Sequence, residues 1–164
     1  MNANPALAAV FAAAVVASAL PASGAPTSAP DFTWDSAGRT VHLKDLHGHL
    51  VVVNFFATWC GPCREETPAF VKIADEYSTR GVYFVGVDSG EETVRQVTDF
   101  AVKYGIDYQL VVDTKDIIQG AYGVSALPTT FIINTNGAVI FHTTGSMAGD
   151  DLTGALDAFL SGAR

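Results

Sequence analysis

Two kinds of hydrophobic pattern alternate along the chain beyond residue 30. Continuous apolar runs cover Leu50–Ala57 and Val82–Val87, and both are rich in β-branched and aromatic residues. Such runs are typical of strands that are buried on both faces of a parallel sheet. Elsewhere, apolar residues recur every three or four positions, which is the spacing of a helix with one buried face. The pattern therefore predicts an α/β domain in which helices cover a sheet.

Three segments have the helical spacing. The first follows the strand at 50–57 and ends near Gly81, the second ends at Gly105 and is capped by Asp88 or Ser89, and the third begins near Asp150. The residues expected to face inward are Phe70, Ile73, Ala74 and Tyr77, then Val94, Val97, Ala101 and Tyr104, and finally Leu152, Leu156, Phe159 and Leu160.

Shorter elements complete the predicted domain. Two strands at 32–34 and 40–43 form a hairpin that turns at 36–38, and a strand at 110–112 precedes a short helix at 117–122. Two further strands, at 129–134 and 138–144, are joined through Asn136-Gly137, a strong hairpin signal.

The first thirty residues differ in composition from the rest. Ala6–Leu20 is apolar or small and uncharged, and a stretch of Pro, Ser, Ala and Gly follows it. The apolar run is shorter than the ~20 residues that span a bilayer, which favours a signal peptide over a transmembrane helix. The first Lys or Arg is Arg39, so the positively charged region that usually begins a signal peptide is missing. A segment that remains as an N-terminal anchor is therefore the alternative. We expect a signal peptide or anchor at 1–20, a linker at 21–30 and one domain at 31–164.

The charge of the chain argues against one class of partner. Nine Lys and Arg residues stand against seventeen Asp and Glu, a formal net charge of −8 at pH 7. Binding along a phosphate backbone needs clustered cations, so we expect no nucleic-acid partner. A charge this far from zero keeps protein molecules soluble and apart, which fits a monomer.

The only two cysteines stand in Trp59-Cys60-Gly61-Pro62-Cys63, where the first buried strand gives way to a helix. Residues i and i+3 are neighbours on a helix, so the two sulfurs can form a disulfide or separate as a dithiol. Pro62 suits a first helical turn. The helix N-terminus favours a thiolate over a thiol at Cys60. We expect Cys60 to be the nucleophile and Cys63 the resolving thiol.

Other uses of a cysteine pair fit less well. A zinc site needs a second Cys or His pair, and the histidines at 42, 47, 49 and 142 lack ligand spacing, so no metal is expected. Haem attachment requires His where Arg64 stands. The peroxiredoxin pattern P-x-x-x-T/S-x-x-C fails, because Val53 and Ala57 occupy its first two positions. A structural disulfide over so short a loop would add little stability.

Two segments resemble a known family. VVVNFFATWCGPCREETPAF (51–70) and ALPTTFIINTNGAVI (126–140) resemble the thioredoxin superfamily, and within it the exported TlpA/ResA-like thiol–disulfide oxidoreductases. The likeness covers about residues 30 to 164. It implies a thioredoxin-like α/β fold: a central mixed β-sheet flanked by helices, with an N-terminal β-hairpin and a central strand and helix insert.

The resemblance also implies a substrate site. Residues 126–130 (ALPTT) match the cis-proline loop that faces the disulfide in this family, whereas proline statistics alone favour an ordinary trans bond at a strand entry. The backbone before such a proline is free to pair with an extended substrate peptide. The expected substrate-binding residues are Trp59, Gly61, Pro62, Leu127 and Pro128.

One acidic residue is expected to assist the cysteines. Asn54 stands where thioredoxins carry a buried Asp that moves protons, and Asn cannot titrate. Glu66 follows Cys63 by three positions and resembles the acid of the C-x-x-C-x-x-E pattern in ResA-like reductases. We therefore count Glu66 with Cys60 and Cys63 as catalytic. The alternative is a solvated acid at a helix start.

The resemblance favours an exported protein-disulfide reductase that needs no cofactor beyond its own redox-active cysteines. Its substrates would be specific protein disulfides, such as those of apocytochrome c or of a copper-site assembly protein. An exported dithiol in an oxidising compartment needs re-reduction, which implies a membrane electron donor. The alternatives are a DsbA-like oxidase that forms disulfides and a non-catalytic thioredoxin-fold binding module.

Overall fold

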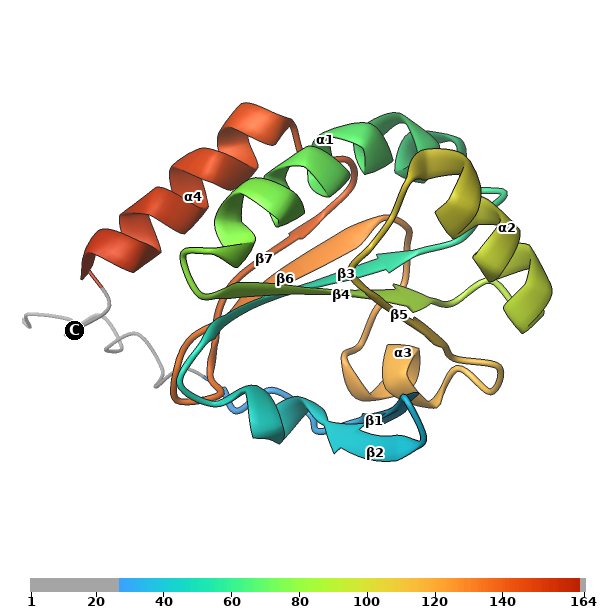
Figure 1. Cartoon of the computed structure of the whole chain (residues 1–164), viewed down its shortest axis with the longest axis horizontal. Helices are drawn as coiled ribbons and strands as arrows, with labels where there is room; N and C mark the ends of the chain where they lie inside the picture. Colours follow the sequence, from blue (N-terminus) through green and yellow to red (C-terminus); the bar gives the residue numbers. More distant parts are fainter. Residues whose placement is uncertain (1–26, 163–164) are drawn as a thin grey trace, which may run out of the picture.

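A computed structural model describes residues 27–162 of the chain and shows a mixed five-stranded sheet between two covering layers (Figure 1). The strand order is β5-β4-β3-β6-β7. β4 is parallel to β3 and β5, and β6 is antiparallel to β3 and β7. The strands are β3 (Leu50–Phe56), β4 (Val82–Asp88), β5 (Gln109–Val112), β6 (Thr129–Ile133) and β7 (Val139–Thr144).

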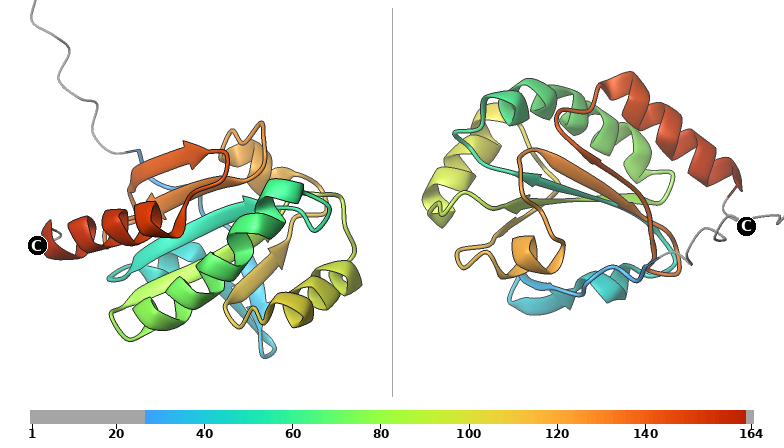
Figure 2. Two further views of the ribbon diagram at one scale, coloured as in Figure 1. Left: turned by 90° about the horizontal axis from the view of Figure 1, so that it is seen from above. Right: turned by 180° about the vertical axis from the view of Figure 1, so that it is seen from behind.

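Helices cover one face of the sheet, and a smaller layer covers the other (Figures 1 and 2). The first layer holds α1 (Gly61–Ser78), α2 (Val94–Tyr104) and α4 (Gly149–Gly162). The second holds the hairpin β1 (Thr33–Ser36) and β2 (Arg39–His42), the 3₁₀ helix η1 (Leu43–Leu46) and the short helix α3 (Ile117–Ala121). The expected thioredoxin-like fold and its N-terminal hairpin are confirmed, and β5 and α3 occupy the segment expected as the insert.

The central strand β3 explains why its sequence is apolar without a break. Every residue of β3 is buried, because each face of the strand meets a different layer. Val52 packs with α1 and α4, whereas Val53 and Phe55 pack in the cluster that includes side chains from α3 and the hairpin. Full burial of such side chains is worth about 1.5–3 kcal/mol each. The strand that leads into the cysteines is therefore held from both sides.

The expected cap and inner face of α2 are partly wrong. Thr93 caps this helix, not Asp88 or Ser89: its Oγ1 accepts a hydrogen bond from the Gln96 N–H (3.3 Å), and the Gln96 side chain accepts one from the Thr93 N–H (2.9 Å). The reciprocal pair is a capping box, which satisfies two backbone donors that the helix leaves free. Val94 is exposed in the first turn, and Phe100 joins Val97 on the buried face.

The predicted signal peptide or anchor (1–20) and most of the predicted linker (21–30) fall within residues 1–26, which lie outside the described part of the chain. Within it, Ala29 N–H donates to the Gly137 carbonyl, and Val139 N–H donates to the Thr27 carbonyl, both at 2.9 Å. The chain is thus paired with the start of β7 before the expected domain boundary at 31. Of the helices in 27–162, none is both long and apolar enough to cross a membrane.

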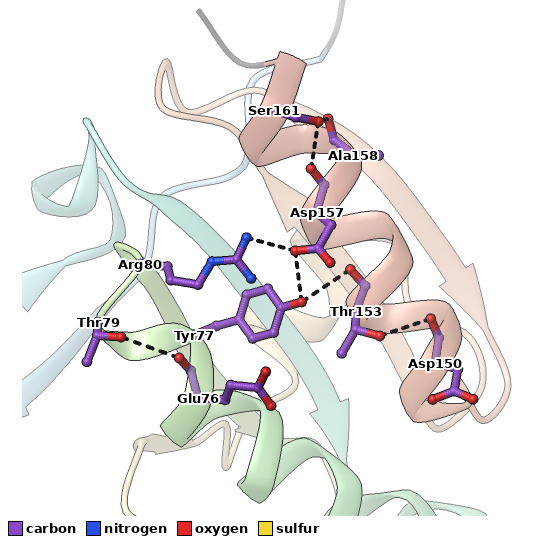
Figure 3. Close-up of polar contacts among 9 residues, drawn as sticks. All are labelled: Glu76, Tyr77, Thr79, Arg80, Asp150, Thr153, Asp157, Ala158 and Ser161. Carbon is purple, nitrogen blue, oxygen red and sulfur yellow. Dashed lines mark hydrogen bonds and ion pairs between the residues drawn. The ribbon is translucent and has the colours of Figure 1, made fainter.

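A polar contact joins the end of α1 to α4 (Figure 3). The Tyr77 hydroxyl donates to Asp157 Oδ1 (3.0 Å), and Arg80 donates to the same oxygen (2.8 Å). The Arg80 guanidinium also lies 4.4 Å from the centre of the Tyr77 ring. The Tyr77 hydroxyl also lies 3.5 Å from the Thr153 carbonyl, so this buried side chain finds its hydrogen-bond partners on α4.

We expect Tyr77→Phe to lower the free energy of unfolding by about 1 kcal/mol, because one hydrogen bond is lost while the ring stays packed. Urea denaturation of both proteins measures the difference. Tyr83→Phe is the matched control, since the Tyr83 side chain is exposed. Equal effects of the two substitutions would contradict a specific role for the Tyr77 hydroxyl.

Candidate active site

The two cysteines lie where β3 leads into α1. Cys60 is the N-cap of α1, and Cys63 lies in the first turn, where Pro62 is accommodated without loss of a helix hydrogen bond. Their sulfurs form a disulfide across Cα atoms 5.3 Å apart. The helix geometry thus brings the predicted pair together.

The two sulfurs differ in access and in hydrogen bonding. Cys63 is completely buried, whereas Cys60 retains 5% of its surface. The Cys63 N–H donates to Cys60 Sγ at 3.2 Å. In the reduced protein, this N–H and the positive end of the helix dipole would both stabilise a thiolate at Cys60. The geometry gives the more accessible sulfur the better environment for negative charge.

Glu66 lies one helical turn beyond Cys63, on the buried face of α1. Only 6% of its surface is exposed. Asn54 Nδ2 donates to one carboxylate oxygen, and the Met147 N–H donates to the other, each at 3.0 Å. Burial raises the pKa of Glu66 above its ordinary value, against the opposing effect of these two donors. Asn54, which stands where thioredoxins carry a buried aspartate, therefore contacts Glu66 directly.

A groove of about 470 Å³ opens beside the disulfide. The Leu127–Pro128 peptide bond is cis, as the resemblance implied, and Leu127 packs against the buried cluster that contains both cysteines. Pro128 itself is buried. Within residues 27–162, the Leu127 backbone has no hydrogen-bond partner. The groove is lined by Trp59, Cys60, Gly61, Pro62, Ser89, Gln119, Val124, Ser125, Ala126 and Leu127.

Trp59 forms the outer wall of this groove. The residue is 63% exposed, so most of its side chain is open to solvent. The indole Nε1 donates to the Gly90 carbonyl at 3.4 Å. This contact ties the segment before Cys60 to the loop that follows β4.

A second acid holds the same segment and was missed in the sequence. The buried Glu92 accepts a hydrogen bond from the Thr58 N–H (2.6 Å) and another from the Thr58 hydroxyl. Thr58 precedes Cys60 by two residues, so Glu92 fixes the backbone that leads into the disulfide. The signal that could have revealed it is an acid just after a strand that ends at the same sheet edge as β3.

Asp88 ends β4 and was also missed as a group of the site. It pairs in register with Phe56, only 1% of its surface is exposed, and neither carboxylate oxygen has a partner in the described part of the chain. Burial, together with the neighbouring Glu92 carboxyl, raises the pKa of Asp88 to about 8. Burial and the neighbouring carboxyl thus favour the protonated form of this acid.

No group of His, Cys, Asp and Glu side chains within residues 27–162 has an arrangement that could hold a metal ion. His42, one of the four histidines, is engaged elsewhere: its Nδ1 lies 2.9 Å from Asp31 Oδ2.

Comparisons with known proteins agree with this geometry. Residues 26–142 match the model of the AhpC/TSA family. The thiol-disulfide oxidoreductase ResA of Geobacillus thermodenitrificans is 39% identical over 77% of this chain and 72% of its own. ResA of Bacillus subtilis is also 39% identical, over 74% of this chain and 68% of its own. The structure of a thioredoxin family thiol:disulfide interchange protein from Chlorobium tepidum superposes with a TM-score of 0.75 at 31% identity, over 85% and 99% of the two chains.

We expect Asp88→Asn to change how stability depends on pH. Because folding raises the pKa of Asp88 from 3.8 to about 8, the folded state binds this proton more tightly than the unfolded chain does. Its contribution is therefore present below pH 4 and is lost as the pH rises towards 8. The variant should be about 1–3 kcal/mol more stable than the parent above pH 8 and similar to it in acid.

Urea denaturation over a pH series measures this effect. Asp107→Asn, which neutralises an exposed carboxyl in a loop, is the control and should leave the pH profile unchanged. A parallel shift of the Asp88→Asn curve at every pH would contradict the titration of Asp88.

Proposed function

The chain belongs to the AhpC/TSA family and is a thiol–disulfide oxidoreductase of the ResA type, and from this premise we propose that it reduces disulfides of specific partner proteins outside the cytoplasm, with Cys60 as nucleophile and Cys63 as resolving thiol. The observation that carries the assignment of roles is the pairing of the more accessible sulfur with the Cys63 N–H at the start of α1.

The proposed reaction runs in two exchanges. The Cys60 thiolate attacks one sulfur of the substrate disulfide, forms a mixed disulfide and releases the other substrate sulfur as a thiolate, which takes up a proton. Cys63 loses its proton, attacks Cys60 Sγ and releases the second substrate thiol. The Cys60–Cys63 disulfide is formed, and the substrate has gained two electrons and two protons.

Substrate binding is proposed at the groove beside the disulfide. The free backbone of Leu127 supports pairing with an extended segment of the substrate, as a strand pairs with a sheet edge. Trp59, Gly61 and Pro62 would contact the other side of the substrate, since all three line the groove. Cys60, the attacking residue, lines the same groove.

Glu66 is proposed as the proton carrier for the resolving step. Its raised pKa, its burial and its place one turn from Cys63 support this role, because the thiol of a buried cysteine needs a nearby base to lose its proton. Asn54 would orient the carboxyl rather than titrate. The carboxyl and the thiols would then titrate as one coupled set.

The cellular setting follows from the resemblance and from the chemistry. We place the protein outside the cytoplasm, exported or anchored through its N-terminal segment. The dithiol must be regenerated there, so a membrane-bound thiol donor would return the two electrons. Apocytochrome c and copper-site assembly proteins, both of which need reduced cysteines, are the proposed substrates, and the chain is expected to act as a monomer.

A trapping experiment tests the roles of the cysteines. Cys63→Ser should accumulate mixed disulfides with substrate proteins, because the exchange stops after the first step, whereas Cys60→Ser should trap none. Gel electrophoresis without reductant, followed by mass spectrometry of the linked cysteines, identifies both partners. Trapping through Cys63 in the Cys60→Ser variant would reverse the roles. Equilibration with glutathione gives the direction: a potential well below that of glutathione fits a reductase, and one near that of DsbA indicates an oxidase.

A second experiment tests Glu66. Glu66→Gln retains the shape and deletes the charge, so it should lower the apparent pKa of the cysteines and slow the resolving step about tenfold or more. Ultraviolet absorbance of the thiolate against pH, and the decay of a preformed mixed disulfide on Cys60, measure the two effects. Glu65→Gln is the exposed neighbouring control. Superimposable titrations and equal decay rates would leave Glu66 with a structural role only.

A further inference from the structure

We propose that Ser89 and Gln119 form a polar subsite in the groove that selects substrates with an uncharged hydrogen-bonding side chain beside the reactive cysteine. The proposal rests on the reductase function above and adds a preference that the cysteines and the proline loop do not supply. Both residues line the groove together with Cys60.

Ser89 is held beside the cysteine turn by its backbone. It follows β4 directly, and its N–H donates to the Phe56 carbonyl at 2.9 Å, at the end of the strand that leads to Cys60. The residue is 9% exposed, and its hydroxyl oxygen has no hydrogen-bond partner in the described part of the chain. An unpaired buried hydroxyl is costly, so a ligand that pairs with it gains affinity.

Gln119 reaches the same groove from α3. Its backbone is fixed by Asp113, whose carboxylate accepts the Gln119 N–H (2.8 Å) and the Ile117 N–H (3.0 Å). The side-chain oxygen of Gln119 is buried and, like the Ser89 hydroxyl, has no partner within residues 27–162. Both residues therefore line one groove, and each carries a covered side-chain oxygen without a partner in the described part of the chain.

Ser89 lies across the cysteine turn from the proline loop, whereas Gln119 lies on the loop side, where its carbonyl accepts the Val124 N–H (3.1 Å). In the sheet, β3 runs between β4 and β6, so Ser89 after β4 and Leu127 before β6 flank the end of β3 on opposite sides. A substrate strand paired with the Leu127 backbone can direct a side chain towards Ser89 and Gln119. Rotation about one or two side-chain bonds turns their covered oxygens towards that side chain.

The rest of the lining decides what the subsite accepts. Apart from Ser89, Gln119 and Ser125, the groove is apolar or glycine, and none of its lining residues is charged. A charged substrate side chain would lose its water without gaining a counter-ion. An apolar one would leave the hydroxyl and the amide unpaired. Serine, threonine, asparagine or glutamine meets both conditions.

The test uses peptides with one cysteine, linked as a disulfide to the chromogenic 2-nitro-5-thiobenzoate, with the same guest residue on both sides of the cysteine. The reduced protein should react roughly 5- to 20-fold faster when the guest is Ser or Asn than when it is Val or Asp, the gain from one or two hydrogen bonds. Ser89→Ala and Gln119→Leu should each remove most of this preference. Ser125→Ala, an exposed serine of the same groove, is the control and should retain it.

The small disulfide of 2-mercaptoethanol allows a failure of the proposed subsite to be distinguished from a failure of the proposed reductase function. It has no guest residue, so the parent and all variants should reduce it at the same rate, which also shows that the variants are folded. Equal rates for all guests in the parent would overturn the subsite and leave the reductase function intact. Failure of the parent to reduce even the small disulfide would overturn the function itself.

A variant that introduces a charge provides a gain-of-function test. Gln119→Lys places a cation in the groove, so the preferred guest should change from Asn to Asp, because the buried carboxylate then has a counter-ion. Unchanged guest preference in this variant would place the side chain of residue 119 outside the path of the substrate and overturn its assignment.

Discussion

The site depends on the way β3 is held on all sides. Strands β4 and β6 pair with its two edges, and separate apolar clusters pack on its two faces. The strand therefore ends at a fixed point, and the turn after it delivers Cys60 to the N-terminus of α1. Because β3 lies between β4 and β6, the loops of both neighbours reach the same edge. This strand order places Glu92 and Ser89 on one side of the disulfide and the cis-proline loop on the other.

Two electrostatic effects oppose each other around this disulfide. The N-terminus of α1 stabilises a thiolate at Cys60 and so favours the reduced state. Carboxyl groups lie close by: Glu66 follows Cys63 by one turn, and Glu92 binds Thr58. Negative charge there disfavours a thiolate, which makes the dithiol a better electron donor. Burial raises the pKa of Glu66 and thereby moderates this repulsion, because a protonated carboxyl carries no charge. The balance between these effects sets how readily the dithiol releases electrons to a substrate.

The parts of the molecule that the sequence could predict are those with a local cause. The unbroken apolar run at 50–57 requires burial on both faces, and the cysteine spacing at a strand-to-helix junction requires a redox-active turn. The link between Asn54 and Glu66 could be inferred from the family pattern. Asn54 stands where thioredoxins carry an acid, and Glu66 supplies an acid three positions after Cys63. Ser89 and Gln119 could not be inferred in this way, because they are thirty positions apart and only the folded structure brings them to one groove. The cap of α2 was misplaced because several polar residues precede this helix, and only the fold selects Thr93 among them.

The groove must accept extended substrate segments of different sequence and still favour some of them over others, and different parts of its lining suit these two requirements. Main-chain pairing at Leu127 is available to any extended segment, so it gives affinity without reading the sequence. A purely apolar lining would select by size and shape, and it would not strongly reject a side chain of the same shape that merely adds a hydroxyl. Unpaired oxygens at Ser89 and Gln119 discriminate through the cost of leaving them unsatisfied. An oxidoreductase with the proposed preference for a few partner proteins would need such a cost close to the reacting sulfur, where every substrate must pass.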